Sequence, residues 1–171
     1  MQKKIFFLIL LIITFKGFSQ TNAKEKISIN TEIVGKGNEK YCKVFCEGNN
    51  YFIKTTIKNN EDSSIYFYQW SCSWQSNWFT NNDSVYVKPV ECDANTIERI
   101  TLLPKQTVTF YGIVSTQNQL EGRYFKLGFI YLRNWNDCWN FDKKSEMNSI
   151  KNVYWSNSIL LRSINNTYEI N

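Results

Sequence analysis

The chain has 171 residues, of which 43% are hydrophobic and 16% aromatic, and its formal net charge is +5. The hydrophobic fraction excludes an intrinsically disordered chain, and the length suits a single domain. Part of the positive charge comes from Lys3, Lys4 and Lys16 near the N-terminus, and the rest of the chain is close to neutral. Because nucleic-acid binders usually carry a clustered basic face, we predict no nucleic-acid partner.

The first residues have the three parts of a secretory signal peptide. Two lysines precede an apolar run, Ile5–Phe15, and small residues follow it. The run is much shorter than the roughly 20 residues that span a bilayer. We therefore predict a signal peptide over residues 1–19 and an exported protein, periplasmic or extracellular, with no transmembrane segment after leader cleavage. The mature chain, 20–171, is predicted to form a single β-sandwich domain.

The N-terminal half of the mature chain shows the alternation of half-buried strands. Residues 27–33 alternate apolar and polar side chains, and Gly35–Asn38 is then expected to break the chain. Tyr51–Lys58 alternates again, and Asn59–Asp62 is expected to form a turn because Asn and Asp close local hydrogen bonds. Ile65–Trp70 is dense in the β-branched and aromatic residues that strands prefer.

Five further strands are predicted in the second half: Val85–Val90, Thr96–Leu102, Thr107–Val114, Arg123–Leu132 and Val153–Leu161. No window longer than ten residues shows convincing helical periodicity. We therefore predict an all-β fold, an antiparallel β-sandwich or barrel of about 7–9 strands. The stretch between the last two predicted strands is long for a structureless loop, and such loops are often functional or held by a bridge.

Five cysteines are present, at positions 42, 46, 72, 92 and 138. In an exported chain they are expected to form disulfides rather than metal or redox sites. Cys72 and Cys92 flank a polar, turn-rich segment and form the bridge that we predict. In a strand Cys42 and Cys46 would lie about 13 Å apart, beyond the roughly 7 Å that a disulfide allows. Cys138 with Cys46 or Cys42 is a weaker second pairing, and the connectivity of these three stays open.

The chain contains no histidine, which removes Ser-His-Asp and Cys-His catalytic systems and the common zinc sites. The acidic residues are scattered, and Asp137 and Asp142 in one loop are expected to be solvated. The oxygen-rich stretch Asn134–Asp142 lacks the ordered spacing of a calcium-binding loop. We predict that the protein is not an enzyme, has no catalytic residues and binds no metal or cofactor.

The aromatic residues are the most informative feature, because Trp and Tyr serve sugar and protein contacts when they are exposed. They gather in two segments, 70–79 and 135–141. The alternative is that these rings cap the ends of the sandwich or pack on disulfides, and we favour that alternative for Trp70. The ligand or partner contacts that we predict are Trp74, Trp78, Trp135, Trp139 and Phe141.

Three segments carry a resemblance to a known family. Ile57–Ile65 is a strand, an Asn-rich turn and a strand; Leu103–Phe110 is a Leu-Pro turn leading into a strand; and Glu121–Tyr124 is similar to a tyrosine corner. Their order resembles small immunoglobulin-like domains of exported bacterial proteins and, more distantly, bacterial intracellular proteinase inhibitors. The resemblance covers about half of the chain and implies an immunoglobulin-like antiparallel β-sandwich. Lys126 stands where an antibody domain has its second bridging cysteine.

These observations predict a non-catalytic β-sandwich that acts as a binding or interaction module for a protein or glycan at the cell envelope. The resemblance implies an alternative, a protease inhibitor that presents the disulfide-held loop 73–91. A rigid loop suits inhibition because it loses less entropy on binding. A purely structural envelope component is a third class, which predicts assembly into large complexes.

Overall fold

The computed structural model describes residues 25–37, 49–89, 92–116, 122–140 and 152–161. The predicted signal peptide, the predicted contact Phe141, Cys42 and Cys46 lie outside these residues. Within them the chain forms eleven β-strands and two short 3₁₀-helices, and all the named strand pairs are antiparallel. The predicted all-β fold is confirmed.

The larger sheet contains four strands in the order β1-β2-β7-β5. These strands are β1 (Ile27–Gly37), β2 (Asn49–Asn59), β7 (Thr107–Thr116) and β5 (Val85–Val87). Along β2 the odd-numbered side chains from Tyr51 to Asn59 are buried, whereas most of the others are only partly covered. This period of two lays one face of the sheet on the core, as the sequence pattern predicted.

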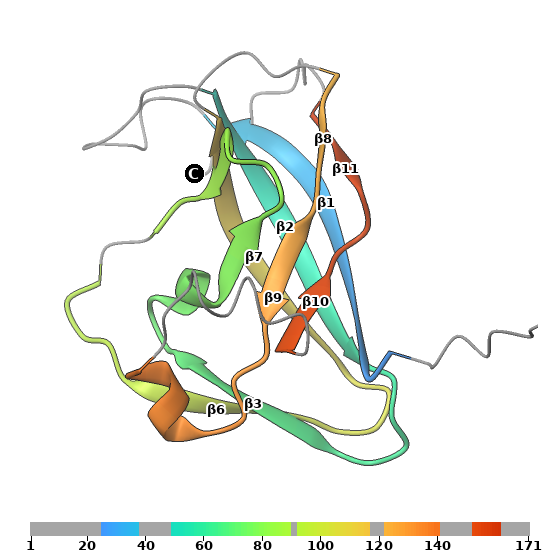
Figure 1. Cartoon of the computed structure of the whole chain (residues 1–171), viewed down its shortest axis with the longest axis vertical. Coiled ribbons are helices and arrows are strands. Elements are labelled where there is room, and N and C mark those ends of the chain that lie inside the picture. The colour runs from blue at the N-terminus through green and yellow to red at the C-terminus, as the bar shows by residue number, and fades with distance from the viewer. Residues whose placement is uncertain (1–24, 38–48, 90–91, 117–121, 141–151, 162–171) are drawn as a thin grey trace, which may run out of the picture.

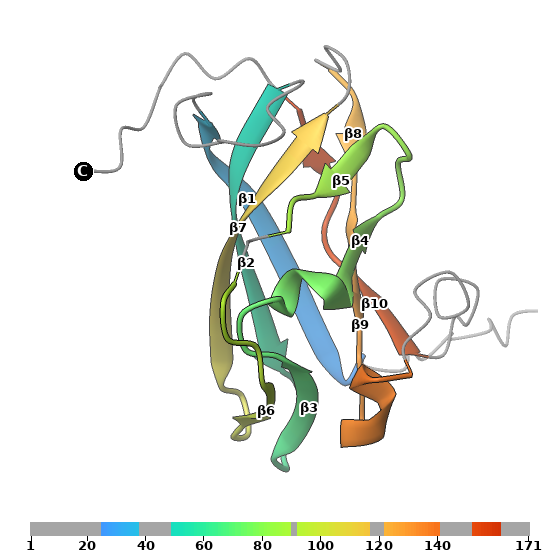
Figure 2. The ribbon, with the colours of Figure 1, turned by 90° about the vertical axis from the view of Figure 1, so that its left-hand side faces the viewer.

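A second layer faces this sheet, and Figure 2 shows the two layers edge-on. It contains β4 (Trp78–Thr80), β9 (Leu127–Ile130) and β10 (Val153–Trp155), with β9 in the middle. The pair β8 (Tyr124–Phe125) and β11 (Ile159–Leu160) continues beyond it. Two facing antiparallel layers give the domain a single core between them.

A third group of elements lies at one end of the two layers (Figure 1). Strand β3 (Ile65–Trp70) pairs with β6 (Ile97–Leu102), and a bridge between Tyr68 and Leu132 joins this pair to the segment that follows β9. The 3₁₀-helix η3 (Trp135–Cys138), the orange coil in Figure 1, packs against β3.

The core is rich in aromatic side chains. Trp78 contacts Phe129 with ring centroids 4.9 Å apart, and Phe129 contacts Phe67 at 5.0 Å. Such rings dominate the burial energy of a small domain because each one buries roughly 150–250 Å². The largest fully buried side chains are Trp78, Tyr51, Phe67, Phe125, Phe129, Ile27, Ile53, Ile57, Leu102, Leu127, Ile130 and Leu161.

Asparagine side chains tie the elements together. Asn59, at the end of β2, donates from its amide to the carbonyl oxygens of Ser63, Leu102 and Leu103. Asn157 pairs with the backbone N–H and C=O of Thr31 at 2.7 and 3.0 Å, which covers the outer edge of β1. Asparagine suits these positions because one side chain carries both a donor and an acceptor.

The boundaries of several strands differ from the predictions. The expected break at Gly35–Asn38 is wrong for its first three residues, because β1 continues to Gly37 after a register shift between Ile33 and Gly35. Strand β4 was not predicted, since three residues are too few to show alternation. The predicted strand Arg123–Leu132 divides at Lys126, and Val153–Leu161 divides where Ser156 and Asn157 turn to β1.

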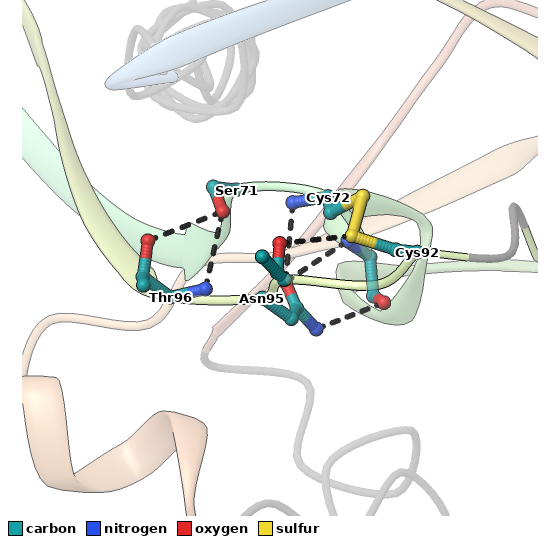
Figure 3. The surroundings of a disulfide bond; sticks show 7 residues. Ser71, Cys72, Cys92, Asn95 and Thr96 are labelled. Atoms are coloured by element: carbon teal, nitrogen blue, oxygen red, sulfur yellow. Dashed lines mark hydrogen bonds between the residues drawn. A yellow bond between two sulfur atoms is a disulfide. The ribbon is translucent and has the colours of Figure 1, made fainter.

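The predicted disulfide between Cys72 and Cys92 is present, with Cα atoms 5.9 Å apart. It closes the excursion that the chain makes between β3 and β6 (Figure 3). Asn95 accepts from the backbone N–H groups of Cys72 and Ser73 at 3.1 and 3.3 Å, and Ser71 and Thr96 bond each other across the same gap. Cys138 is free and buried, so the weaker second pairing proposed for it is wrong.

Tyr124, the residue likened to a tyrosine corner, is 62% exposed. Among the described residues, no helix is long and apolar enough to cross a membrane.

Candidate functional site

Three tryptophans gather on the surface where η3 meets the β3–β6 pair. Trp139 lies at the centre: its ring centroid is 4.8 Å from that of Trp70 and 5.9 Å from that of Trp135. Trp135 is 51% exposed and Trp139 is 60% exposed. We call Trp70, Trp135 and Trp139 the tryptophan ridge. Clustered exposed rings of this size are unusual on a monomeric protein and commonly mark an interaction site.

The helix that carries Trp135 and Trp139 is fixed from below and at its start. Cys138 is buried in a small hydrophobic cluster with Phe79, Ile130 and Leu132. The carboxylate of Asp137 accepts from the backbone N–H of Asn134 at 3.1 Å, which satisfies a donor at the start of the helix. The two exposed rings are therefore carried by an anchored backbone, although they lie outside the strands.

The other predicted contact residues are placed differently. Trp78 is 1% exposed and packs against Phe129 and Phe110, so no ligand reaches its ring, and the prediction of a contact at this position is wrong. Trp74 is half-buried and lies on Phe110, with centroids 5.2 Å apart. Of the predicted contacts that the structure describes, only Trp135 and Trp139 offer most of a ring face to solvent.

Two depressions flank the segment that leads into η3. The first has a volume of about 260 Å³, and its lining includes Arg133, Asn134, Asp137 and Asn140. The second, of about 240 Å³, lies toward β3 and is lined by Lys26, Ser64, Ile65, Tyr66, Tyr131 and Arg133. Arg133 and Tyr131 line both depressions. The surface beside the ridge thus offers guanidinium, carboxylate and amide groups for hydrogen bonding.

Tyr131 forms the wall between the two depressions. Its hydroxyl donates to the carbonyl oxygen of Tyr66 at 2.6 Å. The ammonium of Lys26 lies 4.8 Å from the ring centroid, and the guanidinium carbon of Arg133 lies 5.8 Å from it. Burial raises the pKa of the Tyr131 phenol although Arg133 lowers it, so this side chain remains a neutral donor at physiological pH.

A neighbouring tyrosine shows the reach of the same two cations. The ring of Tyr154 lies 5.8 Å from that of Tyr131. Burial raises the pKa of Tyr154, while Lys26 and Arg133 act to lower it. Both cations thus act on the phenol of Tyr154, and Arg133 acts on that of Tyr131 as well.

The described part of the disulfide-held segment, residues 73–89, is folded into regular elements and is buried in part. It contains the 3₁₀-helix η2 (Trp74–Asn77), β4 and β5, and buried residues include Gln75, Asn77 and Val85. Asn77 donates to the carbonyl oxygens of Tyr68 and Ile130 at 3.1 and 3.3 Å, which binds η2 to β3 and β9.

The described residues include no group of three or more Cys, Asp or Glu side chains that could hold a metal ion. The Cys138 thiol is unreactive by environment, because burial, helped by the charge of Asp137, raises its pKa to about 11.

Several residues were not predicted from the sequence. Trp155, on β10, is 40% exposed but contacts Phe79 at 5.1 Å and is not part of the ridge. Lys26 and Tyr131 come together only through the fold, and no local pattern connects them. Arg133 lies two residues before the tryptophan segment 135–141, which is the one local signal that could have pointed to it.

No protein family model, curated protein or solved structure matches the chain. The site is therefore interpreted from its own geometry.

Proposed function

We propose that the protein is an exported, non-catalytic binding module that holds a glycan on the tryptophan ridge. The observation that carries the proposal is the pair Trp135 and Trp139, whose rings are 51% and 60% exposed on a helix that is anchored beneath them. Leaving so much apolar surface in water has a cost of about 25 cal/mol per Å², which a ligand would remove on binding.

A glycan suits this surface better than a protein partner because of what surrounds the rings. Sugar rings present apolar C–H faces bordered by hydroxyl groups. The ridge offers flat aromatic faces, and the depression beside it offers the polar groups of Arg133, Asn134, Asp137 and Asn140. This combination of a few apolar platforms with placed polar groups is typical of small-ligand sites.

Export is part of the proposal. The Cys72–Cys92 disulfide supports it, because disulfides persist in oxidising compartments. The signal peptide proposed over residues 1–19 would deliver the chain to the periplasm or the exterior, where envelope or environmental glycans are found. The immunoglobulin-like character of the sandwich is likewise a proposal, supported by the two facing antiparallel layers.

The protease-inhibitor alternative has less support from the geometry. An inhibitor of that kind presents a convex, exposed loop, whereas most side chains of η2 and β4 face the interior. Intact activity of a protease panel in the presence of the oxidised protein is the expected result. Stoichiometric inhibition that reduction abolishes would favour the inhibitor instead.

The test is a titration of the mature, oxidised protein with a panel of envelope and plant glycans, followed by tryptophan fluorescence. We expect a saturable change that Trp139→Ala abolishes. Trp155→Ala is the matched control, since it removes a partly exposed tryptophan whose ring contacts Phe79 and none of the ridge rings. A change that survives Trp139→Ala, or no change across the panel, would contradict the proposal and favour a protein partner.

A further inference from the structure

The two depressions beside the ridge hold cations without carboxylate partners. Elsewhere in the described residues, lysines near acids form ion pairs: Lys54 with Glu32 at 3.0 Å, and Lys105 with Asp62. Lys26 and Arg133 form no such pair with any carboxylate in the described part of the chain. Both instead lie over the ring of Tyr131.

The ring that both cations contact is held in place. Tyr131 is buried, its hydroxyl is held by the carbonyl oxygen of Tyr66, and its ring contacts those of Phe67 and Tyr154. Because Lys26 and Arg133 both lie against this fixed ring, the spacing of the two positive groups is restricted before a ligand arrives. Preorganised charges of this kind lose little entropy on binding.

A third cation lies near the second depression. The guanidinium carbon of Arg99 is 5.4 Å from the ring centroid of Tyr66, which lines that depression. The Asp137 carboxylate, which lines the first depression, accepts from the backbone N–H and the side-chain amide of Asn134 at 3.1 and 3.2 Å. Within the described residues, Lys26 and Arg133 therefore line the depressions as cations that form no ion pair.

We infer that the ligand is an acidic glycan, whose carboxylate or sulfate group binds between Lys26 and Arg133 while a neighbouring sugar ring lies on Trp135 and Trp139. This inference rests on the proposed function, since it names the substrate class of the same site. Arg133 joins the two parts, because it lines both depressions and lies two residues before Trp135, the first residue of η3. Arginine is well suited to this role because its planar guanidinium binds carboxylate and sulfate groups through two hydrogen bonds.

The experiment compares charged and neutral members of matched probe pairs by calorimetry. One pair is a galacturonate tetrasaccharide and its methyl ester, and the other is a sulfated galactan tetrasaccharide and its desulfated form. The proteins are the parent, Arg133→Gln, Lys26→Gln and Trp139→Ala. Lys126→Gln is the matched control, because it removes one positive charge from an exposed position between β8 and β9.

We expect the parent to bind the charged member of at least one pair about tenfold or more tightly than the neutral member, as charge-assisted hydrogen bonds predict. Arg133→Gln and Lys26→Gln should each reduce that preference to about threefold or less, and Lys126→Gln should leave it unchanged. The preference should also fall between 20 and 300 mM salt, since exposed charges are screened over about 10 Å at 0.1 M. The probe pair that shows the charge preference tells whether the bound group is a carboxylate or a sulfate.

The possible failures are distinguishable. Equal binding of charged and neutral members, still abolished by Trp139→Ala, would overturn the acidic ligand and leave the glycan-binding ridge intact. A charge preference that depends on Arg133 but survives Trp139→Ala would support the anion site and overturn the ridge. Binding of neither pair by a folded parent protein would overturn both.

Discussion

Two segments of this protein share a local structure and place their tryptophans in opposite environments. Trp74 opens η2 and Trp78 follows it, just as Trp135 opens η3 and Trp139 follows it. Both are four-residue 3₁₀-helices with a tryptophan every fourth residue. Yet Trp78 is 1% exposed, whereas Trp139 is 60% exposed.

The difference arises where each helix ends. Trp78 has an extended backbone, with φ −119° and ψ 147°, and so begins the buried strand β4. Trp139 keeps helical angles, φ −83° and ψ −35°, and stays at the surface beside Trp70. The polar anchors differ as well, because Asn77 is buried between β3 and β9 while Asp137 caps its own helix.

The comparison shows that burial of a tryptophan is decided by the strand that follows it and not by its spacing. Packing accounts for Trp74 and Trp78, since both contact Phe110. Packing explains the position of only part of each ring in Trp135 and Trp139, because the exposed faces contact no other residue of the described chain. Two exposed rings on an anchored helix are the reason to look for a ligand there.

The largest expected effect separates the two segments by stability. Trp78→Ala should lower the free energy of unfolding by about 3–5 kcal/mol, because it opens a cavity in the aromatic core. Trp139→Ala should lower it by less than about 1 kcal/mol, because an exposed ring loses few contacts. Urea denaturation followed by circular dichroism measures both. Similar losses for the two variants would contradict the comparison.

The disulfide encloses η2 but not η3, and its removal is the next largest effect. The double variant Cys72→Ser, Cys92→Ser should lose about 2–4 kcal/mol of unfolding free energy, since the bridge restricts the unfolded chain over a separation of 20 residues. Glycan binding at the ridge should persist in the folded fraction. Unchanged denaturation midpoints for the oxidised parent and the double variant would contradict this prediction.

The polar anchors of the two helices provide a smaller contrast. Asn77→Ala should lower the free energy of unfolding by about 2–3 kcal/mol, because the backbone carbonyls of two strands lose their donor. Asp137→Ala should lower it by about 1 kcal/mol or less, as expected for an exposed helix cap. Thermal and urea denaturation of both variants give the two values. A larger loss for Asp137→Ala would show that η3, not η2, is the structural helix.

The smallest effect concerns the thiol beneath the ridge. The pKa of Cys138 is raised from 9.0 to about 11 by burial, so its neutral form favours the folded state. The stabilisation of the folded state by the neutral thiol is fully present below pH 9 and is lost as pH rises toward 11. Cys138→Ser should therefore remove this loss of stability between pH 9 and pH 11. At pH 8.5, mass spectrometry should find Cys138 alkylated by iodoacetamide much more slowly in the native than in the unfolded protein. Equal rates would mean that η3 does not cover the thiol.

The strands could be predicted from sequence wherever alternation ran for several residues, as in β2 and β3. The Cys72–Cys92 bridge was also predictable, because the two cysteines flank one turn-rich excursion. The burial of Trp78 was not, since a three-residue strand shows no pattern. The partnership of Lys26 with Tyr131 depends on contacts between distant segments, which no local spacing reveals.

The central claim is that the ridge binds ligand while the tryptophans of η2 serve the core, and one measurement compares them directly. The indole N–H signals of the protein's six tryptophans can be assigned by NMR and followed while the glycan panel is added. We predict that the signals of Trp135 and Trp139 shift with saturation, and that the signal of Trp78 stays in place. Saturating shifts at Trp74 or Trp78 without movement at Trp139, or no shifts with any member of the panel, would contradict the account.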